Sequence, residues 1–179
     1  MGRWMLWACL LAMTLASSGG AQSVDSLLRV GDAFPQLGGT AISGRRIDVP
    51  VPGRRTVVIM GFSRAGGDDS RRWDESIAAD SSRADVVVVA ELQSVPRLLR
   101  GTVTLMIKRG VPAGLRDRML LLSRDEAAWK RRLGVTSDEH AYVTLIDTSG
   151  RVRWMSRGAS DSASVQALRA ELADPLRSR

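Results

Sequence analysis

The sequence predicts an α/β domain in which a mixed β-sheet is flanked by helices on both faces. Strand-length apolar runs alternate with segments of helical periodicity, as βαβ units require. Near the end of the chain, two apolar runs are separated only by a Gly-containing turn, which is typical of an antiparallel hairpin. The composition is that of a globular domain, because 44% of the 179 residues are hydrophobic and 25% are charged.

Residues 1–21 have the three-part pattern of a secretory signal peptide. Arg3 supplies a positive charge, residues 4–16 form a continuous apolar run, and small residues lead up to Ala21. The apolar run is too short to span a bilayer comfortably. We therefore expect cleavage after Ala21 and export to the periplasm or the exterior, with an uncleaved anchor as the alternative. Cleavage would remove Cys9, the single cysteine of the chain.

Residues 22–53 are predicted to form a lead-in and a β-hairpin that precede the main domain, residues 54–175. Turn-forming residues at 38–39 and 43–44 flank short apolar pieces, which favours a hairpin. Pro50, Pro52 and Gly53 then interrupt the chain before the first long apolar run.

The main domain is predicted to alternate strands and helices. Five runs of strand length are candidates for the sheet: residues 56–62, 84–92, 118–123, 141–147 and 151–156. Four segments are candidates for helices: residues 70–79, 95–109, 123–133 and 160–173. The third helix is expected to open with a capping box from Ser123 to Glu126 and to end at Gly134. Ser160 or Asp161 is expected to cap the fourth.

The chain is basic, with a formal net charge of +7, and almost all of its basic residues are arginines. These arginines are interleaved with acidic residues, as in residues 71–75, and only 4% of the residues are aromatic. A nucleic-acid-binding surface needs a concentrated basic patch with aromatic platforms, so we expect no nucleic-acid partner. One histidine and one cysteine also exclude a metal cluster of His and Cys ligands, and no cofactor is predicted.

Three blocks of the sequence resemble the thioredoxin-like superfamily. They are VGDAFPQLGG at residues 30–39, TVVIMGFSRAGGDDSRRW at residues 56–73 and LGVTSDEHAYVTLIDTSGRVRW at residues 133–154. Together these blocks cover most of residues 30–158. The resemblance implies a thioredoxin-like mixed sheet flanked by helices, with the N-terminal hairpin as an extension.

Both chemical hallmarks of that superfamily are absent here. Its oxidoreductases carry Cys-x-x-Cys where the first strand turns into its helix, and a cis-proline before a later strand. The resemblance places the first position near Gly66, Gly67, Asp68 and Asp69, and Ala141 in place of the proline. We expect a trans peptide at Ala141, because a cis bond without proline costs about 3 kcal/mol. Thiol–disulfide exchange and cysteine peroxidase chemistry are therefore unavailable to the mature chain alone.

Within the superfamily, the chain resembles the cysteine-poor family of the mitochondrial ATP-synthase assembly factor Ten. The similar positions are Trp73, residues 88–91, Arg97, residues 111–112, 117–118, 141–147 and 150–154, and Gly158. This resemblance implies a redox-inactive, chaperone-like assembly factor that acts on a subunit of a membrane complex. The mitochondrial members face the matrix, whereas this chain carries an export signal, so its client need not be the same.

Residues 95–116 are the strongest candidate for a partner-binding surface. This segment has no acidic residue and contains Arg97, Arg100, Lys108, Arg109 and Arg116. Leu99, Val103 and Met106 share the other side of the predicted helix, and we expect them to pack on the sheet. The basic side would then face water, where it suits an acidic protein or an anionic membrane surface.

Asp68, Asp69 and His140 are the candidates for an alternative function, an enzyme or a small-ligand binder. Two adjacent carboxylates could bind a cation, but near a helix start we favour the interpretation that they cap the helix and complement its dipole. A histidine that acts as a general base needs a nucleophile and an orienting partner, which the sequence does not identify. We therefore expect His140 to be an ordinary loop residue and assign no catalytic residue or metal ligand.

Overall fold

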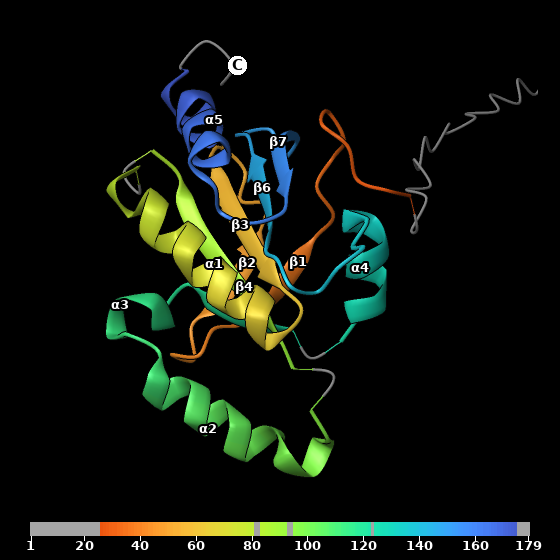
Figure 1. Ribbon diagram of the computed structural model, residues 1–179, viewed down its shortest axis with the longest axis vertical. Coiled ribbons are helices and arrows are strands. Elements are labelled where there is room, and N and C mark those ends of the chain that lie inside the picture. The colour runs from red at the N-terminus through yellow and green to blue at the C-terminus, as the bar shows by residue number, and fades with distance from the viewer. Residues whose placement is uncertain (1–25, 81–82, 93–94, 123, 175–179) are drawn as a thin grey trace, which may run out of the picture.

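The computed structural model describes residues 26–80, 83–92, 95–122 and 124–174 (Figure 1). The predicted signal peptide and Cys9 lie outside these residues. A five-stranded sheet forms the centre of the described chain, with the strand order β5-β4-β3-β6-β7. Its strands are β3 (Thr56–Gly61), β4 (Asp85–Glu91), β5 (Met119–Leu122), β6 (Tyr142–Ile146) and β7 (Val152–Arg157).

The sheet is mixed, as the sequence predicts. β3 pairs in parallel with β4, and β4 pairs in parallel with β5. β6 is antiparallel to β3, and β7 returns antiparallel to β6. All six residues of β3 are buried, which explains why this strand appears in the sequence as an uninterrupted apolar run.

The first face of the sheet is covered by α1 (Arg64–Ile77) and α5 (Ser162–Ala173). Trp73 of α1 and Leu168 of α5 are fully buried there against Val57 and Val143 of the sheet. Trp73 also contacts Trp154 of β7 edge-on, with ring centroids 6.1 Å apart. Asp161, one of the two predicted caps, begins α5 by accepting a hydrogen bond from the Ser164 N–H.

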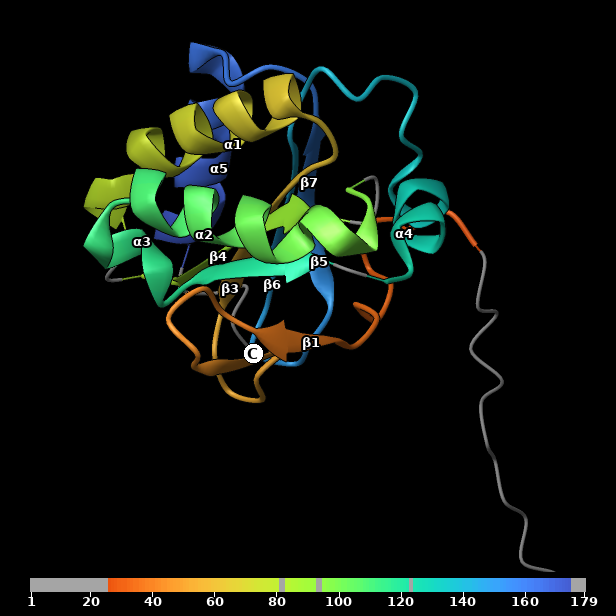
Figure 2. The ribbon, with the colours of Figure 1, turned by 90° about the horizontal axis from the view of Figure 1, so that it is seen from below.

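The second face is covered by the N-terminal hairpin and by α4 (Glu126–Leu133). The hairpin consists of β1 (Leu37–Thr40) and β2 (Arg46–Val49), which pair antiparallel, so the predicted extension is confirmed. Figure 2 shows α1 and α5 on one side of the sheet and β1 on the other. Phe34 of the lead-in packs on Trp129 of α4, with ring centroids 5.5 Å apart, and this contact ties the two covering elements together.

The predicted capping box of α4 is wrong. Asp125 precedes the helix in the left-handed conformation, with φ of 61°, and its side chain makes no capping hydrogen bond. A left-handed residue interrupts the helical path, so the helix cannot begin further upstream. Ser123 lies outside the described residues. Gly134 ends the helix with φ of 64°, as the sequence predicts.

The segment between β4 and β5 differs most from expectation. A 3₁₀ turn (Arg97–Leu99) leads into α2 (Arg100–Gly110), and a short helix, α3 (Ala113–Arg116), follows. α2 lies beyond the sheet and covers neither of its faces (Figure 1). The prediction that Leu99, Val103 and Met106 pack on the sheet is therefore wrong: Leu99 and Met106 are exposed and Val103 is half-buried.

The reason is that other elements already cover both sheet faces, which leaves α2 no core to join. Apolar residues of the segment also lie on several sides of the helix and not in one stripe. Within the described residues, no helix combines the length and the apolarity needed to cross a membrane.

Candidate functional site

The N-terminus of α1 is the position at which the thioredoxin-like resemblance implies a pair of thiols in the oxidoreductases. Ser63 caps the helix: its Oγ accepts a hydrogen bond from the Gly66 N–H at 3.1 Å and donates one to the Asp138 carbonyl at 2.5 Å. The helix therefore begins six residues earlier than predicted, and residues 66–69 lie inside it and not in a loop. The two glycines concealed this start, because glycine has a low helix propensity.

Gly66 is required by the close approach of three backbone segments. A Cβ at this position would lie 2.8 Å from the Asp138 carbonyl oxygen and 3.1 Å from the carbonyl oxygen of His140. On the other side, a Cβ at Gly61 would lie 2.7 Å from the backbone of Gly66. A side chain of any kind, including a thiol, does not fit at Gly66 without movement of the backbone. By contrast, Gly67 has open space around it.

Asp69 is a structural residue and not a helix cap. Its carboxylate is 2% exposed and accepts hydrogen bonds from the Ala141 N–H at 2.9 Å and from Ser160, whose N–H and Oγ lie at 3.2 and 3.1 Å. It thus joins α1 to the start of β6 and to the segment before α5. Asp68 is exposed and lies 3.8 Å from Arg71. The favoured capping interpretation is wrong for both carboxylates, because Ser63 caps the helix.

The segment before β6 packs against the N-terminal part of α1. Among the described residues, the only cis peptide is Val49–Pro50, so Ala141 follows a trans bond, as expected. Ala141 is fully buried and is held by Asp69. His140 is half-buried, and its backbone carbonyl packs against Gly66. Gly66, Gly67, Asp68, Asp69 and Ala141, which were predicted to form a degenerate active-site loop, therefore form a joint between helix and sheet.

Lys130 of α4 reinforces this joint from the other side. Its Nζ lies 2.7 Å from Glu126 and 2.9 Å from Asp138, the residue whose carbonyl accepts from Ser63. It also lies 5.6 Å from the centre of the Phe62 ring, within cation–π range. The hydrogen bond to Glu126 raises the pKa of Lys130 against the opposing effect of burial, and Asp138 adds to the rise.

In the described part of the chain, Asp68, Asp69 and His140, the candidates for an enzyme or a small-ligand binder, do not come together in one site. Asp69 faces inward, Asp68 faces solvent, and no group of three His, Cys, Asp or Glu side chains there could hold a metal ion. The two adjacent carboxylates therefore have different roles, and Asp69 positions the backbone by accepting a hydrogen bond from the Ala141 N–H.

The segment around α2 presents a different kind of surface. Leu98 is 96% exposed, Met106 is 65% exposed and Leu105 is 48% exposed. Lys108 and Arg109 are exposed in the last turn of the helix. Leu105 lies one helical turn before Arg109, so apolar and basic side chains share one side. We call Leu98, Leu99, Leu105, Met106, Lys108 and Arg109 the α2 surface.

The other three basic residues predicted for the partner-binding surface are not part of the α2 surface. Arg97 lies in the 3₁₀ turn and Arg100 is the first residue of α2, and only their backbone is described. Arg116 is half-buried, and its Nε donates to the Val111 carbonyl at 3.0 Å, so it stabilises the turn into α3. Leu98 and Leu105 were missed, because apolar residues in a helix are ordinarily assigned to the core. Their signal was the occurrence of apolar residues on several sides of the helix.

Comparison with known proteins identifies the family and the fold. The family model described as ATP10 protein matches residues 34–172, which is most of the chain. No curated protein matches the sequence significantly. A thiol:disulfide interchange protein of the DsbE type from Chlorobium tepidum superposes with a TM-score of 0.58 at 19% identity, over 81% of this chain and 96% of that one.

A second solved structure gives the same result. The exposed lipoprotein thioredoxin Etrx1 of Streptococcus pneumoniae superposes with a TM-score of 0.57 at 13% identity, over 76% of this chain and 99% of that one. At such low identity these two structures establish the thioredoxin-like fold alone. The family match over residues 34–172 establishes more, and the chain belongs to the ATP10 protein family.

Proposed function

We propose that this chain is a redox-inactive assembly factor that holds a subunit of a membrane protein complex through the α2 surface. The observation that carries this proposal is the exposure of Leu98, Leu105 and Met106 on a segment that covers neither face of the sheet. Clustered exposed apolar side chains are a feature of protein-binding surfaces. Membership of the ATP10 family, which the sequence resemblance associates with ATP-synthase assembly, supports a role of this class.

The closed joint at α1 also supports binding over redox chemistry. The chain retains the thioredoxin-like frame but fills the thiol position with Ser63, Gly66 and the backbone of residues 138–140. The mature chain expected after cleavage contains no cysteine. A thioredoxin-like fold that lacks the reactive thiols can still present a surface for binding a partner.

The charge of the segment indicates the chemistry of the partner. Residues 95–116 contain no acidic side chain, and Lys108 and Arg109 are exposed beside the apolar residues. A partner that is apolar at the centre of the contact and acidic at its rim would complement this surface. We place the interaction in the cell envelope, because residues 1–21 have the pattern of an export signal.

Crosslinking in cells with a tagged full-length chain tests the proposal. We expect mass spectrometry to recover a reproducible membrane-complex subunit. A variant with Leu98→Asn, Leu105→Asn and Met106→Gln should lose it, because the apolar contact is removed. A second variant, Lys108→Glu with Arg109→Glu, should also lose it, because the charge is reversed.

Two control variants separate this surface from exposed residues in general. Val30→Asn changes another exposed apolar side chain, and Arg71→Glu changes an exposed arginine on α1. Both should retain the partner. Retention of the partner by both α2 variants, or the absence of any reproducible partner from the unmodified protein, would refute the proposal.

A second candidate is that the α2 surface binds an anionic membrane. Exposed Leu98, Leu105 and Met106 beside Lys108 and Arg109 also suit a lipid interface. Sedimentation with phosphatidylglycerol vesicles at low and high salt tests it. Binding at low salt that falls at high salt is expected for this mode, and no binding at low salt eliminates it.

A further inference from the structure

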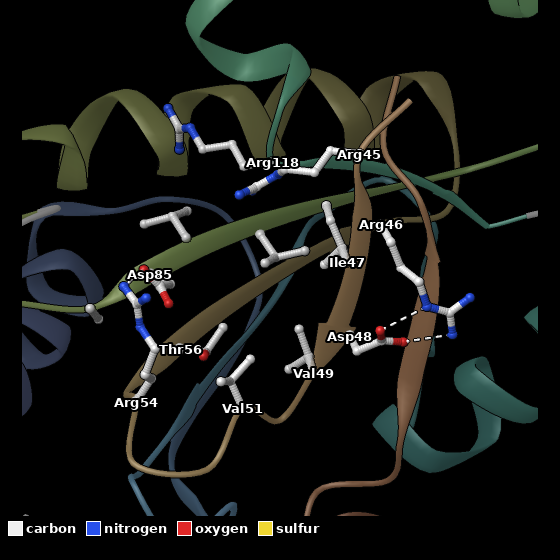
Figure 3. A pocket seen from close by; sticks show the side chains of 13 residues that line it. Arg45, Arg46, Ile47, Asp48, Val49, Val51, Arg54, Thr56, Asp85 and Arg118 are labelled. Atoms are coloured by element: carbon white, nitrogen blue, oxygen red, sulfur yellow. Dashed lines mark hydrogen bonds and ion pairs between the residues drawn. The ribbon is translucent and has the colours of Figure 1, made fainter. Parts of the chain in front are cut away.

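A groove lies between the hairpin and the beginning of the central sheet, on the face opposite α1 and α5. It has a volume of about 420 Å³ and is lined by consecutive residues of β2 and by the first residues of β4. Ile47 and Val49 of β2 and Val87 of β4 form its apolar part. Figure 3 shows charged side chains around these residues, among them Arg45, Arg54 and Asp85. We call it the β2 groove.

Two strand edges without a partner strand border the β2 groove. β2 pairs with β1 on one side and with no other strand of the described chain. β4 pairs with β5 only from Val88 onward, so Asp85–Val87 have no partner on that side among the described residues. Unpaired edges present backbone N–H and C=O groups that can accept an added strand.

The register shows which backbone groups of β2 are available. The Ala41 N–H donates to the Arg45 carbonyl at 2.8 Å, which makes this a hydrogen-bonded pair of the hairpin. Hydrogen-bonded and non-bonded pairs alternate along antiparallel strands. The N–H and C=O groups of Arg46 and Asp48, one and three residues further on, therefore point away from β1 toward the outer edge.

The charges of the groove favour an acidic ligand. Four arginines and two aspartates line it, and Asp74 pairs with one of these arginines, Arg118, which leaves an excess of one positive charge. Arg46 pairs with Asp48 at 2.8 Å, and Arg54 pairs with Asp85 at 2.6 Å. Arg45 donates instead to the uncharged carbonyl of Asp117 at 2.8 Å, so this bond leaves its positive charge uncompensated.

Thr56 gives independent support for a ligand. This residue is 1% exposed and lines the groove, yet its Oγ1 has no hydrogen-bond partner. Buried hydroxyl groups in folded proteins are rarely left unpaired. A polar group that enters the groove would supply the missing partner, and this requirement does not depend on the arginines.

We propose that the β2 groove binds an extended acidic peptide segment of a partner protein, which adds as a strand to the outer edge of β2. Backbone hydrogen bonds to Arg46 and Asp48 would fix its path, and its acidic side chains would meet Arg45. The unpaired edges favour a peptide over a small anion, because a small anion does not satisfy a row of backbone groups. The inference concerns a second surface and is independent of the α2 surface.

Fluorescence anisotropy with a labelled peptide, Val-Glu-Val-Asp-Val-Glu-Val, tests the proposal on the chain from residue 22 onward. We expect saturable binding of this peptide and none of Val-Lys-Val-Lys-Val-Lys-Val. N-methylation of alternate peptide bonds should abolish binding, because it removes the backbone donors. Amide NMR shifts should concentrate at Arg46–Val49 and Asp85–Val87.

Three protein variants complete the test. Arg45→Glu should weaken binding about tenfold or more by reversing the uncompensated charge. Asp48→Pro should do the same by removing an outward N–H, a change that edge strands tolerate. Arg71→Glu on α1 should leave binding unchanged, and circular dichroism establishes that each variant is folded.

Several results would overturn the proposal. They are equal binding of the acidic and basic peptides, no binding at millimolar peptide, NMR shifts outside the groove, or unchanged affinity in Arg45→Glu. Retained binding of the N-methylated peptide, together with displacement by acetate, would show a small-anion site only. None of these results would alter the crosslinking outcome for the α2 variants, so the two proposals fail separately.

Discussion

Replacement of Asp69 by alanine should destabilise the fold far more than replacement of its neighbour Asp68. The buried Asp69 carboxylate accepts three hydrogen bonds, one from Ala141 and two from Ser160. Bonds to a charged acceptor contribute about 1.5–3 kcal/mol each and are not additive, so we expect a total loss of about 3–5 kcal/mol. Part of this loss arises because the fully buried Ala141 N–H would be left without a partner.

Asp68 provides a matched control one residue away. Its side chain is exposed and lies 3.8 Å from Arg71, and exposed ion pairs contribute at most about 1 kcal/mol. Asp68→Ala should therefore change stability by less than about 1 kcal/mol. Asp69→Asn keeps one acceptor oxygen and should fall between the two alanine variants.

Urea unfolding followed by tryptophan fluorescence measures the difference. With a slope of about 2 kcal/mol per molar urea, Asp69→Ala should lower the midpoint by about 1.5–2.5 M. Asp68→Ala should lower it by less than about 0.5 M. Equal midpoints for the two alanine variants would refute the assignment of Asp69 as the joint between α1 and β6.

Three further predictions concern the same region and its surroundings. Gly66→Ala should lower the free energy of unfolding by about 1–3 kcal/mol, because the new Cβ collides with the Asp138 carbonyl. Gly67→Ala should leave stability unchanged or raise it, since there is open space around Gly67. Equal melting temperatures of the two variants would contradict this prediction. Burial acts to raise the pKa of Asp147, but the hydrogen bonds that Ser149 and Arg151 donate to its carboxylate outweigh burial, and the pKa is lowered overall. The advantage of the wild type over Asp147→Asn should thus be complete above about pH 5 and shrink as the pH falls below about 4, which urea titrations can follow. The chain from residue 22 onward should not reduce insulin disulfides, because it has no thiol; turnover above the buffer rate would contradict this.

The fold was predictable because its strands carry strong local signals. β3 and β4 are continuous apolar runs, and such runs identify buried strands without reference to their neighbours. The turn at Gly150, with φ of 81°, indicated the return of β7 along β6. The hairpin was predictable from the turn at residues 43–44, where Gly44 has a φ of 97°. The other predicted turn, at Gly38 and Gly39, is wrong, because both glycines lie inside β1 and pair with β2.

The candidate site was predicted in location but not in function. The sequence predicted a degenerate active-site loop at residues 66–69 and Ala141, and the structure brings Asp69 and Ala141 together, with residues 66–69 inside α1. It did not reveal that Ser63 caps α1, because two glycines weaken the helical signal there. Nor could it separate Asp68 from Asp69, because adjacent residues differ only in the direction that the helix imposes on each side chain.

What the sequence determined by itself was the order and type of most elements, the absence of a thiol from residue 22 onward and the basic character of residues 95–116. These properties depend on composition and on contacts between residues close in the chain. Only the tertiary structure decided that Asp69 is buried and Asp68 is not, that the β2 groove lies between two unpaired edges, and that α2 stands away from the sheet. The spacing of apolar residues along a helix is the same whether they face the protein core or a binding partner, so the sequence does not distinguish the two. The structure does, because other elements cover both faces of the sheet and leave no core for α2 to join.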